Sequence, residues 1–229
     1  MEKFPQFKKF SDDNDNFLNT KEAKEDVFEA SYRLANYLKQ EKINNVMFLD
    51  NSARQASVGL QEAWKEVGEN EKAPNIYFIN PEEFVNSIIV ESPFFINNDD
   101  LEELSDKFAS IFKNINKEDP ILLYDSCIHS GISLFSVEYF LKRIGFSNVK
   151  LGVTSVGEGF SEEKRKKIDL VCLESGAALG CRPFGHPSYV SDNPGEIISK
   201  ANRTSPNSFE KGKMERDKIR SLFKKDEEQ

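Results

Sequence analysis

One segment constrains the fold more than any other: four apolar residues, an acid, a short polar loop with one glycine, and then a helical pattern. The apolar run is Ile121 to Tyr124, the acid is Asp125, and the loop reaches Ser133. A continuous apolar run of this kind is typical of a strand buried on both faces, and a glycine lets the chain turn closely into the next element. The segment predicts a strand–loop–helix unit of an α/β protein.

The rest of the chain repeats this alternation of short apolar runs and amphipathic stretches. Apolar residues at helical spacing predict helices over 22–40, 53–67, 101–115 and 134–144, with Asp99 or Asp100 capping the third. Apolar runs predict strands over 45–50, 75–79, 120–125, 149–156 and 169–173. This order predicts a mostly parallel central sheet flanked by helices, which binds ligands outside the carboxyl ends of its strands.

Length and composition suit one α/β domain with added ends. The chain has 229 residues, of which 38% are hydrophobic. We expect a loose N-terminal arm over 1–20, the domain over 21–200 and a charged helix or tail over 201–229. The net charge of -8 argues against general nucleic-acid binding. No apolar run is long enough to cross a bilayer, so no membrane association is expected.

The cysteines indicate a reducing compartment. There are three of them, at 127, 172 and 181, and none has the spacing of a structural zinc site. An odd number of cysteines and an N-terminus without an apolar leader favour a cytoplasmic protein. Cys127 lies beside Asp125, and we expect it only to pack as a small apolar residue.

The loop after Asp125 has the features of a phosphate site. Gly131 would let the backbone approach a ligand closely, and the amides at the start of the following helix would carry partial positive charge. Ser130 and Ser133 would add hydroxyl donors. Asp125 would hold sugar hydroxyls or a hydrated Mg²⁺. The alternative is that the segment only makes a turn, as strand–Asp–loop–Gly–helix segments do in many α/β folds.

This arrangement resembles the PRPP-binding motif of type I phosphoribosyltransferases. The family pattern is four apolar residues, two acids and a loop that ends Thr-Gly-x-Thr/Ser. The matching positions are 121–124, Asp125, Ser130, Gly131 and Ser133, whereas Ser126 replaces the second acid. The resemblance covers roughly residues 22 to 190 and implies a type I phosphoribosyltransferase-like fold.

The resemblance also implies an activity and a set of ligands. It implies a Mg²⁺-dependent phosphoribosyltransferase that binds PRPP, transfers the 5-phosphoribosyl group to an unidentified base or other nucleophile, and releases pyrophosphate. Because Ser126 removes one acid, a noncatalytic PRPP- or nucleotide-sensing protein is the alternative. Family members often form homodimers. The 5-phosphate would lie on His129, Ser130, Gly131, Ile132 and Ser133, and the ribose on Asp125 and Ser126, with Asp125 also at the metal.

His129 is a candidate for proton transfer. It stands where purine-salvage members of the family carry an acid that acts on the base nitrogen, and a histidine there would give or take a proton near neutral pH. With Asp125 it makes up the predicted catalytic set. The alternative is that its ring nitrogens bond to the loop or to phosphate.

Two further segments match loops of the family. Asn51, Ser52, Ala53 and Arg54 follow the strand 45–50, and in the family this loop binds pyrophosphate; an arginine would clamp the anion. The alternative is that Asn51 and Ser52 cap the next helix. Near the last strand, Phe184 would stack on a base and Arg182 would hold phosphate in a base pocket; the alternative there is a rigid surface loop.

Overall fold

A computed structural model describes residues 21–49, 53–81, 98–157, 159–173 and 206–224. Strands and helices alternate along most of this length, as the sequence predicts. In chain order the elements are α1 (Lys21–Gln40), β1 (Asn45–Leu49), α2 (Arg54–Val67), β2 (Asn75–Ile79), α4 (Asn98–Phe112), β3 (Ile121–Ile128), α5 (Ile132–Arg143), β4 (Val149–Val156), α6 (Glu162–Arg165), β5 (Leu170–Leu173) and α7 (Pro206–Leu222).

The five described strands form one parallel sheet in the order β2-β1-β3-β4-β5. β1 and β3 are neighbours at its centre although α2, β2 and α4 separate them in sequence. The β1 strand is fully buried along its length, which explains why it is apolar without alternation. The predicted fold class, a mostly parallel central sheet flanked by helices, is confirmed.

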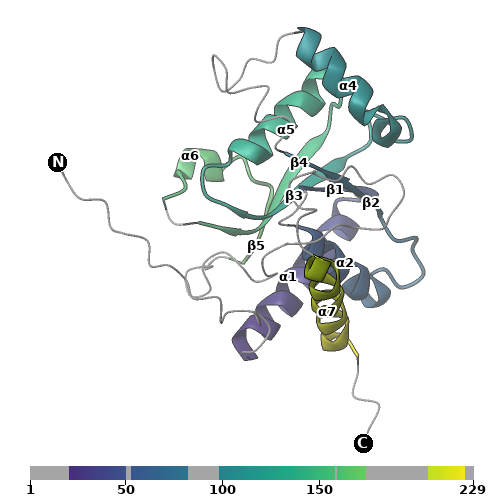
Figure 1. Cartoon of the computed structure of the whole chain (residues 1–229), viewed down its shortest axis with the longest axis vertical. Coiled ribbons are helices and arrows are strands. Elements are labelled where there is room, and N and C mark those ends of the chain that lie inside the picture. Colours follow the sequence, from purple (N-terminus) through teal and green to yellow (C-terminus); the bar gives the residue numbers. More distant parts are fainter. Residues whose placement is uncertain (1–20, 50–52, 82–97, 158, 174–205, 225–229) are drawn as a thin grey trace, which may run out of the picture.

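Helices cover both faces of this sheet (Figure 1). On one face, α1, α2 and α7 pack against alternate strand residues that include Val46, Phe48 and Leu122. On the other face, α4 and α5 pack against the intervening residues, among them Met47 and Leu123. The period-two alternation of the strands therefore divides the protein into two separate hydrophobic cores.

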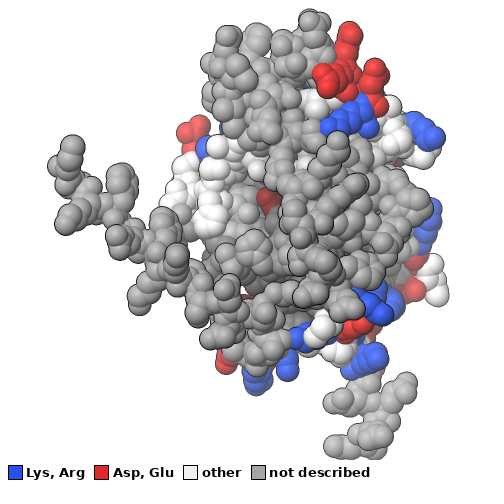
Figure 2. All heavy atoms as spheres, in the orientation of Figure 1, with Lys and Arg blue, Asp and Glu red and all other residues white. Residues whose placement is uncertain are grey.

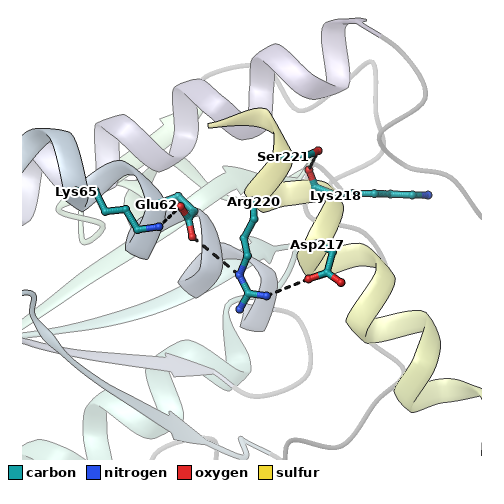
Figure 3. Close-up of polar contacts among 6 residues, drawn as sticks. All are labelled: Glu62, Lys65, Asp217, Lys218, Arg220 and Ser221. Carbon is teal, nitrogen blue, oxygen red and sulfur yellow. Dashed lines mark hydrogen bonds and ion pairs between the residues drawn. The ribbon is translucent and has the colours of Figure 1, made fainter. Parts of the chain in front are cut away.

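The C-terminal helix α7 belongs to the first of these cores despite its charged sequence. Ile219 is fully buried against the α1–α2 layer, and Leu222 and Phe223 pack beside it. Figure 3 shows the polar rim of this contact, where Arg220 lies 3.1 Å from Asp217 and 4.0 Å from Glu62 of α2. The division into an arm, a domain and a charged tail stays a prediction, because 1–20, 174–205 and 225–229 lie outside the described residues.

Two local predictions were wrong, and one short helix was missed. The helix α4 begins at Asn98, so Asp99 and Asp100 lie inside it rather than at its cap. The strand predicted to end at Asp125 continues to Ile128, because the equally long β4 pairs with Cys127 and Ile128. The short helix α6 was missed; its N-cap, Ser161, accepts a hydrogen bond from the Lys164 amide at 3.3 Å.

Charged side chains of both signs lie on the described part of the surface. On the face shown in Figure 2, acidic and basic side chains are interspersed among the described residues. In the described ranges, none of the helices is both long enough and apolar enough to serve as a membrane span.

Candidate functional site

The strand order creates a topological switch point between the central strands β1 and β3. β1 leads through α2 to β2 on one side, and β3 leads through α5 to β4 on the other. The two connections therefore diverge from adjacent strands, and in open parallel sheets this switch point is where ligands bind. β1 ends at Leu49 and β3 ends at Ile128 at this point, so α2 and α5 both begin near it.

The β3–α5 loop is a tight turn made by Gly131. Its backbone is left-handed, with φ 75° and ψ 3°, and it is the N-cap of α5 with no side-chain cap. A Cβ atom at this position would lie 2.5 Å from Phe135 Cε2 and 3.1 Å from Phe160 Cε2. Glycine is thus required twice, for its backbone conformation and for the space above two aromatic rings.

Local hydrogen bonds fix the rest of the loop. The Ser130 hydroxyl accepts from the Ile132 amide at 3.3 Å, and the Phe135 amide donates to the Gly131 carbonyl at 2.9 Å. Amides of a first helical turn have no partner within their own helix, so those of Ser133 and Leu134 point out of the N-terminus of α5. These amides and the helix dipole favour an anion at this end.

Asp125 and Ser126 lie inside β3 rather than in the loop. Both are buried, at 7% and 8% exposure, and Asp125 Oδ1 accepts a hydrogen bond from the Ser126 amide at 2.7 Å. Asp125 is paired with Val153 of β4, three residues before the end of its own strand. The acid and its neighbour are therefore set back from the phosphate loop along the strand.

His129 is exposed at the carboxyl end of β3, where the adjacent β4 chain ends in Gly157. The two backbones are joined by a hydrogen bond from the Gly157 amide to the Ile128 carbonyl at 2.7 Å. A Cβ atom on Gly157 would overlap the imidazole at Nδ1 and lie 2.8 Å from Cε1. The absence of a side chain at 157 thus gives the His129 ring its place beside the loop.

The upstream loop is described only in part. Asn51 and Ser52 lie outside the described residues, and Ala53 is the N-cap of α2 without a side-chain cap. Arg54 is 5% exposed, and its guanidinium lies over the Phe78 ring at 4.8 Å from the centroid. The Arg54 side chain is thus enclosed by the domain, and its role toward pyrophosphate stays a prediction.

The remaining predicted contacts are not placed. Arg182 and Phe184 of the base pocket lie outside the described residues. Within the described ranges, no cluster of three or more His, Cys, Asp or Glu side chains is arranged to hold a metal ion. Toward its carboxyl end, β3 carries the Asp125 carboxylate, the Ser126 hydroxyl and the Cys127 thiol as oxygen and sulfur donors.

Sequence reasoning missed the segment that lies against the phosphate loop. Phe160 stacks on Phe135 of α5, with ring centroids 6.5 Å apart and planes at 10°, and Lys164 donates to the Ser130 carbonyl at 2.9 Å. The signal for α6 was present in Ser161 followed by two glutamates, which is a helix start. Its contact with the loop, 34 residues away along the chain, had no local signal.

Comparison with known proteins gives matches of structure alone. No protein-family model matches the chain, and no curated protein matches its sequence. The hypoxanthine phosphoribosyltransferase of Trypanosoma cruzi in complex with IMP matches with a TM-score of 0.43 and 12% identity, over 68% of this chain and 77% of that one. The purine phosphoribosyltransferase from Pyrococcus horikoshii matches with a TM-score of 0.37 and 12% identity, over 64% and 80%.

These matching structures are all named as phosphoribosyltransferases. A hypoxanthine-guanine-xanthine phosphoribosyltransferase also matches, with a TM-score of 0.39 and 13% identity over 65% of this chain and 73% of that one. Because the TM-scores are below 0.5, nothing about substrate or catalysis follows from the likeness. The chemistry has to be argued from the residues of the loop and the strand beneath it.

Proposed function

We propose that this chain binds PRPP through the β3–α5 loop and transfers its 5-phosphoribosyl group to a base or other nucleophile. The observation that carries the proposal is Gly131, a left-handed glycine that turns a central strand into a helix N-terminus at the switch point of the sheet. β1 ends at the same point, so a ligand bound to the β3–α5 loop can extend toward the connection between β1 and α2.

In the proposed complex the 5-phosphate lies on the loop. Residues 129–133 surround it, backbone amides at the start of α5 and the hydroxyls of Ser130 and Ser133 donate to its oxygens, and the dipole of α5 stabilises its charge. Asn51, Ser52, Ala53 and Arg54 would face the pyrophosphate. Arg182 and Phe184 would supply the pocket of the acceptor base.

The reaction then breaks one bond and forms one. The nucleophile attacks the anomeric carbon of the ribose while the bond from that carbon to the pyrophosphate oxygen breaks, and the electron pair leaves with pyrophosphate. The protein contributes orientation and stabilisation of the charge that builds up on the sugar and the leaving group. His129 is proposed to accept the proton that the nucleophile loses, or to bond to the phosphate, and both roles stay open.

Magnesium is the metal that this chemistry implies. Mg²⁺ is bound in many phosphoryl-ligand sites by one or two carboxylates completed by substrate phosphates and water. Asp125 supplies one such carboxylate, and the diphosphate of the ligand would supply further oxygens. The donor set is thus compatible with a metal that arrives with PRPP, for which it would neutralise charge on the leaving group.

A second function is supported by Ser126. A hydroxyl where the family motif has an acid weakens the hold on ribose and metal without touching the phosphate loop. A protein that binds PRPP or a nucleotide and reports its presence without turnover needs only the loop. The two functions therefore share a binding step, and only the transferase goes on to break the bond to pyrophosphate.

One experiment separates the two functions. The protein is incubated with PRPP, Mg²⁺ and a panel of purine and pyrimidine bases, with binding measured by calorimetry and turnover by pyrophosphate release. Release above background supports the transferase, binding without release supports the sensor, and no binding refutes both.

A variant pair tests the loop itself. Gly131→Asp adds a negative charge to the loop and a Cβ that would lie 2.5 Å from Phe135, so it opposes the anion and distorts the turn, and it is expected to abolish PRPP binding. Gly159→Asp is the matched control, because Gly159 also has a left-handed backbone, with φ 81° and open space around it. Unchanged affinity in Gly131→Asp would remove the loop from the site.

A further inference from the structure

We propose that Lys164 of α6 is a positioning residue for the phosphate loop, acting on it through the carbonyl of Ser130. This inference rests on the proposed function in one respect, that the loop binds a phosphate. It assigns to the β4–α6 segment a role that neither the loop motif nor the strand order indicates.

The first step is the direction of one peptide. The Lys164 ammonium donates to the Ser130 carbonyl oxygen at 2.9 Å. In a trans peptide the carbonyl and the next amide point in opposite directions, and the chain has no cis peptide in its described parts. The bond from Lys164 therefore directs the Gly131 N–H away from α6.

The second step is that Lys164 is itself held in place. Ser161 caps the first turn of α6 through the Lys164 amide, and Phe160 stacks on Phe135 beneath the loop. At the start of the segment, Gly157 is bonded to the end of β3. The β4–α6 segment is thus fixed to the strand before the loop and to the helix after it, and Lys164 reaches the peptide between them.

The third step is the cost of releasing that peptide. Gly131 populates several backbone regions with little penalty, so the turn has no intrinsic preference for the observed φ of 75°. Without an external bond, the Ser130–Gly131 peptide is free to flip, and a flip turns one N–H from the phosphate position to the opposite side. A charge-assisted bond to the carbonyl selects one orientation before the ligand arrives.

The charge of Lys164 also has the right sign for the ligand. It adds to the dipole of α5 at the same end of the helix, yet its ammonium is engaged by a backbone oxygen. Lys166 lies on the same segment and is equally exposed, but no hydrogen bond in the described part of the chain joins it to the loop. A comparison of variants at Lys164 and Lys166 therefore separates an effect on the orientation of the loop from an effect of positive charge alone.

The test uses Lys164→Gln, Lys164→Arg and Lys166→Gln, with ribose 5-phosphate as the probe in Mg²⁺-free buffer. Calorimetry gives its affinity, and the ¹⁵N resonance of Gly131 reports the bond to the preceding carbonyl. Lys164→Gln is expected to weaken ribose 5-phosphate binding about three- to tenfold and to shift the Gly131 resonance. Lys164→Arg should retain most of the affinity, and Lys166→Gln should match the wild type in both measurements.

Two results would overturn the inference. Equal affinities in Lys164→Gln and Lys166→Gln would show that only charge matters. An unshifted Gly131 resonance in Lys164→Gln would show that the bond does not position the loop, and this result counts even if the wild type binds no sugar phosphate. Failure of the wild type to bind would instead refute the proposed function, so the two failures are distinguishable.

Discussion

The substitution Gly131→Ala tests the geometry of the loop without introducing charge. It adds one methyl group to a residue with φ 75° whose Cβ position lies 2.5 Å from Phe135 and 3.1 Å from Phe160. Gly159→Ala adds the same group at φ 81°, where no atom of the described residues lies within 4 Å apart from the chain neighbours of Gly159. The first variant carries both backbone strain and overlap, whereas the second carries backbone strain alone.

The magnitudes follow from these two terms. A left-handed backbone costs an L-residue about 1–2 kcal/mol, which is the full expected loss for Gly159→Ala. At Gly131 the methyl group must also displace Phe135 from its stack with Phe160, which adds about 1–2 kcal/mol for overpacking and a weakened aromatic pair. We expect Gly131→Ala to lower the free energy of unfolding by about 2–4 kcal/mol.

Urea unfolding provides the measurement. Trp64 is the single tryptophan of the chain and is buried at 7% exposure, so its fluorescence reports the transition. Phe135→Leu in the Gly131→Ala background should recover part of the loss, because it removes the ring that the methyl group meets. The reasoning is refuted if Gly131→Ala costs no more than Gly159→Ala.

Three further outcomes are expected. Tyr124→Phe should lower the free energy of unfolding in urea by about 1–2 kcal/mol, because the buried Tyr124 hydroxyl bonds to Thr154 at 2.7 Å and to Cys172 at 3.3 Å. In a double-mutant cycle, the effect of Tyr124→Phe should depend on whether Thr154→Val is also present. Burial, followed by the hydrogen bond to Glu66, raises the pKa of Tyr32 to about 12 from an ordinary value of 10. The contribution of Tyr32 to stability is therefore full below pH 10 and is lost as the pH rises through 12. Tyr32→Phe should flatten the pH dependence of the free energy of unfolding in this range. Ile219→Ala should lower the free energy of unfolding of the domain by about 2–5 kcal/mol, whereas Arg220→Ala on the exposed rim of α7 should lower it by less than about 1 kcal/mol. Equal effects of the two substitutions would mean that α7 is not part of the core.

The sheet could be predicted from sequence because its strands are buried on both faces. Asn75–Ile79 and Val149–Val156 have the predicted bounds, since apolar and β-branched runs there end in turn residues. β3 was harder, because Ser126 and Cys127 are small and polar enough to look like loop. β3 extends beyond Asp125 because Cys127 pairs with Ser155 of β4, a strand that comes later in the sequence.

The turn at the end of β3 could be predicted because its signal is local, whereas the contacts around it were missed because they depend on folding. Gly131 before a helix predicts a close bend of the backbone, and the structure has a tight left-handed turn there. Lys164, Phe160 and Gly157 reach the loop because β4 pairs directly with β3, and no local pattern in the sequence indicates which side chains then meet the loop. Ile219 is a similar case: it lies on the charged helix α7, and its burial depends on packing against α1 and α2.

The two proposed functions place different demands on Asp125. Binding of a phosphate needs the amides of the loop, which lie beyond the end of β3. Turnover also needs a carboxylate near the ribose, and Asp125 lies three residues back, roughly 10 Å along the strand, with Oδ1 already bonded to the Ser126 amide. If the ligand reaches it, PRPP should bind more tightly with Mg²⁺ and lose that gain in Asp125→Asn, as calorimetry would show. Because Asn keeps the shape of the side chain, affinity independent of both Mg²⁺ and Asp125 would locate all recognition in the loop and favour the sensor over the enzyme.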